Sequence, residues 1–337
     1  METYTKTENV WRAANPSNQY SDIRHTIVIA APAANNDYYQ EVYSQIIAFD
    51  IAYAQSIIGK DNVVVLGDKK ALKLLEKELP NDILLQAQMR DIWMRDFTTI
   101  NPTNPIQFRY AAAAQGGRQR DADWVQMGFV KFTDNLGINY PYIDLILDGG
   151  NVVDNHKDKL IVTDRFLEDN HLSYSQAKTR LKKRLNLASV AIIPADDPEG
   201  LAHADGMVMF IDDNTLVINR YDEPFRDQVI RELTSSFPNL KIVEIDTDFD
   251  REVWDAQFSS ACGIHVNSLV TPNFIYMPVF GTALDQEIIK TIQANSSKQV
   301  VPINAENVCF MGGSVRCLGW QMSGEAAKKV INAARVK

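Results

Sequence analysis

Residues 124–151 read WVQMGFVKFTDNLGINYPYIDLILDGGN, and they hold the pattern that decides the fold. Apolar side chains in 124–132 recur at helical spacing, whereas 142–147 is dense in Ile and Leu, as in a short buried strand. Residues 148–151 then form a polar, glycine-containing turn. The stretch therefore predicts a helix, a strand and a turn in succession.

The same succession occurs five times along the chain. The predicted strands are 82–86, 142–147, 189–194, 240–245 and 299–304, and the helices before them are 70–80, 124–132, 173–185, 225–237 and 284–294. The strands begin 60, 47, 51 and 59 residues apart. A period near fifty residues indicates either a closed ring of units or an open array. Ser173 with Gln176 predicts a capping box at the start of the third helix.

Composition narrows the class of protein. The chain has 337 residues and 45% hydrophobic residues, and no low-complexity linker divides it, so we predict one α/β domain over 1–337. With 34 Lys and Arg against 43 Asp and Glu, the net charge is -9, which argues against nucleic-acid binding and suits a cationic ligand. No apolar run reaches the length of a membrane span, and the first residues lack a signal-peptide core. We therefore predict a cytoplasmic protein with no membrane partner.

The three cysteines are Cys262, Cys309 and Cys317. Their odd number and the absence of CxxC spacing predict reduced thiols, with neither a disulfide framework nor a zinc cluster. Cys262 and Cys309 are interpreted as small buried side chains. Cys317 follows a Gly-Gly pair, where the backbone can approach a ligand closely, so it is either another buried side chain or a nucleophile.

Unusual residues follow each repeated strand. The segments are 90–96 (RDIWMRD), 148–151 (DGGN), 199–206 (EGLAHADG), 254–267 (WDAQFSSACGIHVN) and 311–317 (MGGSVRC). If the five units surround a common axis, these segments meet at one end of it. The alternative is that loops simply collect Gly, Asp and Asn.

The residues of three of these segments allow more than one interpretation of their role. His203 and Asp205, two apart on a predicted extended segment, face one pocket as an acid/base pair or a metal site, or lie at the surface. Only five histidines are present, none in HxxxH spacing, so a histidine-rich metal site is not expected. Trp93 and Asp96 form either an ion-pair cluster beside a core tryptophan or a clamp for a planar cation. Asp148 belongs to a turn, and its acid can also line the pocket.

Taken together, Trp93-Met-Arg-Asp96, Asp148-Gly-Gly-Asn151, His203-Ala-Asp205-Gly206, Asn267 and Gly312-Gly313-Ser-Val-Arg-Cys317 resemble the agmatine deiminase and bacterial peptidylarginine deiminase family. The resemblance covers roughly residues 80–320. It implies a pentein fold, a five-bladed α/β propeller with pseudo-fivefold symmetry, and hydrolysis of a guanidinium group without metal or other cofactor. The implied substrate is a small cationic guanidino compound or a peptidyl arginine.

The resemblance also implies roles for single residues. Cys317 is the expected nucleophile, His203 the acid/base, and Asp96 and Asp205 the acids that bind the guanidinium. Trp93 forms a wall of the site and Asn267 supports it as a polar group. We also expect Asp148 and Gly313 to line the substrate site.

The sequence departs from the agmatine deiminases in two features that bear on the substrate, and one of them is the absence of a Trp-Pro element near the N-terminus, where the sequence reads IVIAAPAAN. Arg316 precedes Cys317, where those enzymes usually carry His. Arg118 and Arg120 match an Arg-x-Arg with which the peptidylarginine branch grips a substrate carboxylate; alternatively, they pair with Asp121 and Asp123. Agmatine, free arginine and peptidyl arginine all remain candidates, and the oligomeric state, a homo-oligomer included, is left open. Other hypotheses are an amidinotransferase, a metal-dependent hydrolase using His203 and Asp205, and a non-catalytic guanidine-binding protein.

Overall fold

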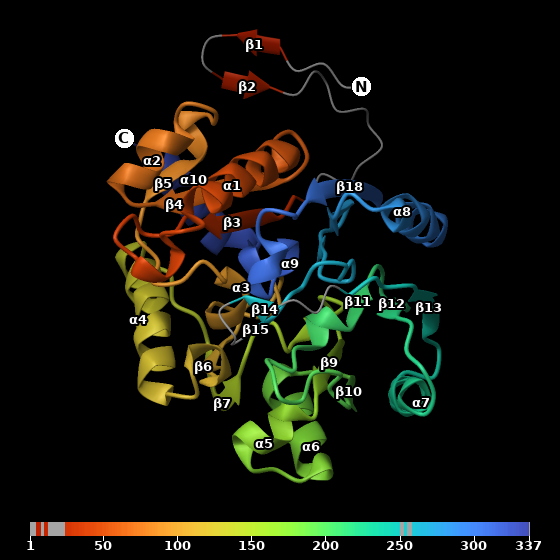
Figure 1. The fold of residues 1–337 in the computed structure, drawn as a ribbon. Coiled ribbons are helices and arrows are strands. Elements are labelled where there is room, and N and C mark those ends of the chain that lie inside the picture. The colour runs from red at the N-terminus through yellow and green to blue at the C-terminus, as the bar shows by residue number, and fades with distance from the viewer. Residues whose placement is uncertain (1–4, 8–9, 13–23, 250–252, 255–257, 337) are drawn as a thin grey trace.

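The computed structural model describes residues 5–7, 10–12, 24–249, 253–254 and 258–336 (Figure 1). The strands are β1 Thr5–Thr7, β2 Val10–Arg12, β3 Thr26–Ala30, β4 Asn62–Gly67, β5 Leu84–Gln86, β6 Gln107–Tyr110, β7 Tyr142–Leu147, β8 Val153–Asp154, β9 Lys159–Thr163, β10 Ser189–Ile193, β11 Val208–Phe210, β12 Thr215–Asn219, β13 Lys241–Ile245, β14 Val253–Trp254, β15 Phe258–Ser259, β16 Leu269–Val270, β17 Phe274–Val279, β18 Gln299–Asn304 and β19 Trp320–Met322. The helices are α1 Tyr43–Ile57, α2 Lys69–Leu75, α3 Met94–Phe97, α4 Gln119–Asn135, α5 Arg165–Asn170, α6 Tyr174–Leu185, α7 Phe225–Ser236, α8 Ala283–Asn295, α9 Val315–Leu318 and α10 Gly324–Arg335.

One structural unit recurs around the molecule. Two parallel strands pair with each other, and a helical segment connects them along the chain: β3 with β4, β6 with β7, β9 with β10, β12 with β13, and β17 with β18. A parallel pair needs such a crossover, and the helix covers one face of the strands. The connecting helices include α1, α4, α6, α7 and α8. The predicted repeat of helix and strand is confirmed in the last four units.

The first unit differs from its prediction. The strand equivalent to β7, β10, β13 and β18 is β4, which follows α1 and pairs in parallel with β3. The predicted pair, 70–80 and 82–86, forms α2 and β5, and β5 is an added edge strand that pairs with β4. The sequence pattern predicts a repeating unit at α2 and β5 because these elements have the same order of apolar helix and short strand as the true units.

The chain closes its ring of sheets near its C-terminal end. In three of the sheets a short strand pairs antiparallel with the first strand of the parallel pair: β8 with β9, β11 with β12, and β16 with β17. In the first sheet this place is taken by β19, which pairs antiparallel with β3. Figure 1 shows α3 and α9 near the middle of the molecule with the sheets around them.

Burial explains why the strands are so apolar. All five residues of β3 and of β12 are buried, because helices cover one side and neighbouring units the other. Strands of neighbouring units share apolar clusters; for example, β12 and β17 contribute Val217 and Ile275 to the same one. The predicted capping box is also confirmed, since the side-chain oxygen of Gln176 accepts a hydrogen bond from the Ser173 backbone N–H at 3.0 Å.

The cysteine prediction was wrong for two of the three residues. Cys262 and Cys309 form a disulfide with their Cα atoms 4.8 Å apart, and Cys317 is the free, buried thiol. The two partners are 47 residues apart in sequence, so no local spacing signalled the bond, which exists because the fold brings the 258–264 segment beside residues 309–311. Within the described ranges, no helix is both long and apolar enough to cross a bilayer.

Candidate active site

Two cavities, of about 630 and 300 Å³, meet at Cys317. The residues that line both are Leu201, His203, Phe258, Gly312 and Cys317. The larger cavity is also lined by Asp205 and Asn267, and the smaller by Trp93 and Asp96. Four of the five segments that follow the repeated strands line these cavities. No residue of the remaining segment, 148–151, lines either cavity, but Asp148 forms an ion pair with His203, which lines both. Residues 255–257 of the fourth segment lie outside the described residues.

The Cys317 sulfur has two close polar neighbours. Cys317 lies in α9 and is 6% exposed. The Asn267 side-chain N–H donates to the sulfur at 3.1 Å, and Oδ2 of Asp205 lies 3.8 Å from it. Burial raises the pKa of the thiol well above its ordinary value, the charges of Asp205 and Asp96 raise it further, and the hydrogen bond from Asn267 opposes them. The empty site therefore keeps the thiol protonated.

Asn267 also fixes the backbone before the cysteine. Its side-chain oxygen accepts hydrogen bonds from the Ser314 hydroxyl at 3.0 Å and from the Ser314 N–H at 3.3 Å. The Asn267 side chain is 3% exposed, so both ends of its amide are engaged inside the protein. The residue thus connects the segment before β16 to α9.

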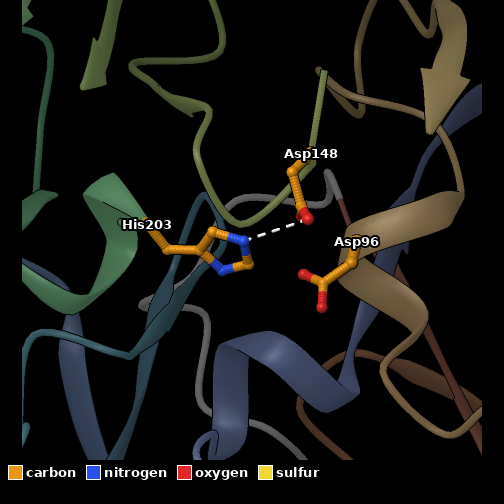
Figure 2. A group of neighbouring side chains, drawn as sticks. All are labelled: Asp96, Asp148 and His203. Atoms are coloured by element: carbon orange, nitrogen blue, oxygen red, sulfur yellow. Dashed lines mark ion pairs between the residues drawn. The ribbon is translucent and has the colours of Figure 1, made fainter. Parts of the chain in front are cut away.

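His203 and two aspartates form a second group of titratable side chains. Figure 2 shows the side chains of Asp96, Asp148 and His203 pointing toward one another, with an ion pair of 3.0 Å between Nε2 of His203 and Oδ2 of Asp148. Burial lowers the pKa of His203, but the charges of Asp148, Asp96 and Asp205 outweigh it and raise the pKa to about 10. His203 is therefore a cation at neutral pH.

Asp96 has no ion pair in the part of the chain that the structure describes, and its Oδ1 has no hydrogen-bond partner there. It is 3% exposed. Burial raises its pKa well above the usual range, and the charge of Asp148 adds to the effect while His203 opposes it. A cation arriving beside Asp96 would stabilise the carboxylate, because an unpaired buried charge is costly.

The predicted extended segment at His203 is wrong in its local structure. His203 precedes a 3-10 turn over Ala204–Gly206, closed by a hydrogen bond from the Gly206 N–H to the His203 carbonyl at 3.2 Å. The Asp205 N–H donates to the Gly150 carbonyl at 3.1 Å. The turn still presents His203 and Asp205 to the larger cavity.

Glycines permit the close approach of these segments. A Cβ at Gly313 would lie 2.5 Å from Cζ3 of Trp93 and 3.0 Å from the Cβ of Cys317. A Cβ at Gly150 would collide with the His203 ring. The 148–151 turn is therefore packed directly against His203, and Trp93 lies beside Gly313. Asp148 and Gly313, which were expected to line the substrate site, are not among the residues that line either cavity.

The two candidate carboxylate-binding arginines differ in position. Arg118 lines the smaller cavity, is 72% exposed in its side chain, and pairs with Asp121 at 2.7 Å. Arg120 is 88% exposed, lies 3.4 Å from Asp121, and is not among the residues that line either cavity. Asp123, the other expected partner, pairs with Arg109 instead.

A metal ion has one candidate position among the described residues. One oxygen each of Asp96 and Asp148 and a ring nitrogen of His203 lie within 4.8 Å of one another. This differs from the His203 and Asp205 pair considered from the sequence. A protonated His203 cannot ligate a metal through its paired nitrogen, so the ion pair with Asp148 competes with metal binding.

A family model described as Porphyromonas-type peptidyl-arginine deiminase matches residues 22–323. The chain belongs to this family. Membership confirms the resemblance found in the sequence and the class of enzyme, a hydrolase acting on C–N bonds of guanidine groups.

Members of related groups lie at low sequence identity. A sequence from Marinomonas sp. (strain MWYL1), provisionally named an agmatine deiminase, is 22% identical over 325 residues, which cover 83% of this chain and 87% of that one. The structure of C. jejuni agmatine deiminase matches with a TM-score of 0.74 at 16% identity, over 90% of this chain and 94% of that one. The Enterococcus faecalis agmatine deiminase matches with a TM-score of 0.72, also at 16% identity and over the same shares. These structures confirm the predicted α/β fold of the deiminases.

Sequence reasoning missed one contact of this deiminase-family site. Nη1 of Arg316 donates to Oδ2 of Asp205 at 2.7 Å. Arg316 had been noted only because it replaces a histidine. The position directly before the nucleophile was the available signal, but the partner depends on how two distant segments fold together.

Proposed function

We propose that the chain is a hydrolytic deiminase that converts a guanidinium substrate to a ureido product and ammonia through a covalent Cys317 thiouronium intermediate. The observation that carries the proposal is that Cys317 and His203 line the same two cavities, and that the buried, unpaired Asp96 lines the smaller of them. A thiol, an acid/base and a carboxylate awaiting a flat cation are the groups that this reaction requires.

Binding precedes activation of the nucleophile. The substrate guanidinium pairs with Asp96 and Asp205 beside the Trp93 ring, which leaves its carbon open to the sulfur. Its positive charge offsets the acids that hold the thiol pKa high, so the thiolate forms when substrate is bound. The protonated His203 favours the thiolate in the same way.

Two half-reactions follow. The thiolate attacks the guanidinium carbon to form a tetrahedral adduct, and His203 protonates the departing amino group, which leaves as ammonia while the C–N bond breaks. Neutral His203 then removes a proton from water, and the resulting hydroxide attacks the thiouronium carbon. The adduct loses its hydroxyl proton to solvent as the C–S bond breaks. The products are the ureido compound and the Cys317 thiolate. The ion pair with Asp148 holds the imidazole in place for both proton transfers.

The substrate is an arginine derivative or agmatine. Arg118 at the smaller cavity supports a substrate with a carboxylate, such as free arginine or a peptide with C-terminal arginine. Agmatine has no carboxylate, and its binding would not use Arg118.

The test is ammonia and ureido formation from agmatine, arginine and a peptide with C-terminal arginine, measured side by side. Cys317→Ala should abolish both products while circular dichroism shows an unchanged fold. Asp123→Asn is the control, because Asp123 is exposed and pairs with Arg109 outside both cavities. Full activity in the Cys317→Ala enzyme would reject the mechanism.

The same assay separates the alternatives. An amidinotransferase would transfer the amidine to an added amine without releasing ammonia. A metal-dependent hydrolase would lose activity with a chelator and keep it after thiol alkylation. A protein that only binds guanidines would give a calorimetric binding signal and no product with any of the three substrates.

A further inference from the structure

Arg316 holds Asp205 through a buried ion pair. Its Nη1 donates to Oδ2 of Asp205 at 2.7 Å, and its Nη2 donates to the Val152 carbonyl at 2.6 Å. The side chains are 13% and 1% exposed, respectively. The planar guanidinium therefore binds a carboxylate and a backbone carbonyl at once, in a geometry that a lysine ammonium does not reproduce.

The arginine approaches Asp205 from outside the two cavities that meet at the sulfur. Asp205 lines the larger of them, whereas Arg316 lines neither. Arg316 lines a separate cavity of about 70 Å³ that does not include Cys317. A substrate in the larger cavity can therefore contact the Asp205 carboxylate while Arg316 binds the same carboxylate from outside that cavity.

The oxygen that Arg316 binds is also the one nearest the nucleophile. Oδ2 of Asp205 lies 3.8 Å from the Cys317 sulfur. An unpaired carboxylate at this distance would oppose formation of a thiolate. Arg316 supplies a compensating positive charge and fixes the distance between the two groups.

The backbone of Arg316 connects further parts of the site. Its N–H donates to the Asn267 carbonyl at 3.1 Å, and Val152, which its side chain binds, directly follows the 148–151 turn. Arg316 thereby joins the segments that carry Asp148, Asp205 and Asn267 to the helix that carries Cys317.

We propose that Arg316 is a positioning residue for the deiminase reaction: its guanidinium orients Asp205 toward the substrate and offsets the charge of that acid at the Cys317 sulfur. The proposal rests on the proposed function for its kinetic part. Its electrostatic part concerns the free enzyme and can be measured without any substrate.

The first experiment measures alkylation of Cys317 by iodoacetamide against pH in the absence of substrate. Cys262 and Cys309 are joined in the disulfide, so Cys317 is the thiol that reacts. We expect Arg316→Gln to slow alkylation at least fivefold at pH 8 and to move the profile to higher pH. Arg316→Lys, which keeps the charge, should fall between Gln and the unsubstituted enzyme. Arg109→Gln, which removes an ion pair with Asp123 outside both cavities, is the control and should leave the profile unchanged.

The second experiment is steady-state kinetics with whichever guanidino substrate is turned over. Misorientation of a substrate-binding acid lowers the rate of attack more than it weakens binding, because Asp96 and Trp93 still contact the substrate. We expect kcat to fall by about 10- to 100-fold in Arg316→Gln with less than a threefold rise in KM. Arg316→Lys should recover part of kcat.

The outcomes separate the two proposals. If no substrate is hydrolysed but the alkylation profile moves to higher pH in Arg316→Gln, the deiminase proposal fails. The electrostatic effect of Arg316 on the Cys317 thiol then still stands. If Arg316→Gln only lowers the melting temperature, with alkylation and kcat at the levels of the Arg109→Gln control, Arg316 is structural and the inference is overturned.

Discussion

The side-chain amide of Asn267 donates a hydrogen bond to the sulfur of Cys317 over 3.1 Å, across 50 residues of sequence. This bond opposes the burial and the negative charges that raise the thiol pKa. The amide oxygen meanwhile holds Ser314, so one side chain both orients the nucleophile loop and favours the thiolate.

Replacing Asn267 should therefore raise the thiol pKa further. A rise of about one unit would slow alkylation of Cys317 about tenfold at any pH well below the midpoint. Asn267→Ala removes the donor, and Asn267→Asp also adds a negative charge, so the aspartate variant should react more slowly than the alanine variant. An alkylation profile that is the same in all three enzymes would show that the bond does not act on the thiolate.

Replacing Asp148 should lower the pKa of His203. Asp148 is the largest of the charges that raise this pKa to about 10, and Asp148→Asn removes its charge. The NMR titration of His203 should move to lower pH, and the alkaline limb of kcat should move with it, because protonated His203 is required for ammonia release. A titration still centred near pH 10 would contradict this prediction.

The ion pair between Asp148 and His203 should also stabilise the folded state, and this stabilisation should decrease as the pH rises. A histidine whose pKa is raised on folding stabilises the folded state fully below its unfolded value of 6.5, and this contribution disappears as the pH rises to about 10. The difference in unfolding free energy between the unsubstituted enzyme and Asp148→Asn should narrow from pH 6.5 to 10. Urea unfolding at several pH values measures it.

A methyl group at Gly313 should disable the site. It would lie 2.5 Å from the Trp93 ring and 3.0 Å from the Cys317 Cβ, so either the wall or the nucleophile must move. A displacement of about 1 Å can cost on the order of 100-fold in rate. Gly206→Ala is the comparison, because Gly206 lines the larger cavity and its Cβ would meet nothing within 4 Å. Equal kinetics for the two variants would count against the packing argument.

Arg118 should matter only for substrates with a carboxylate. Arg118→Ala should raise KM for arginine or for a peptide with C-terminal arginine about tenfold or more, and should leave agmatine kinetics within about twofold. Arg120→Ala is the control, since Arg120 is 88% exposed and lies outside both cavity linings. A matching loss in Arg120→Ala would mean that the loop moves when substrate binds.

The disulfide should be countable and stabilising. Under denaturing conditions without reductant, one thiol per chain should react with an alkylating reagent, and three should react after reduction. Loss of a bond that closes a loop of this length should lower the free energy of unfolding by about 2–4 kcal/mol. Mass spectrometry counts the thiols, and denaturant unfolding of Cys262→Ser with Cys309→Ser measures the loss.

The repeat and the site could be predicted from the sequence because both depend on the order of neighbouring apolar and polar residues. Each strand such as YIDLIL is short and apolar, and each is followed by a distinctive polar segment, so the residues at one end of a ring could be named in advance. The first unit was misassigned because α2 and β5 carry the same local pattern as a true unit.

Contacts between distant segments could not be predicted in this way. The disulfide and the bond from Arg316 to Asp205 each join positions whose separation depends on the packing of whole units. The turn at His203 was missed because the Asp205 N–H inside it bonds to the carbonyl of Gly150, more than fifty residues earlier.

The pairing of β19 with β3 also sets the order in which the enzyme becomes competent. Cys317 stands three residues before β19, so the sulfur takes its position only when residues 320–322 pair with β3. Before this pairing, the acids and the imidazole can be in place while the thiol is not yet held beside them. During refolding, activity should therefore appear only after β19 has joined the sheet.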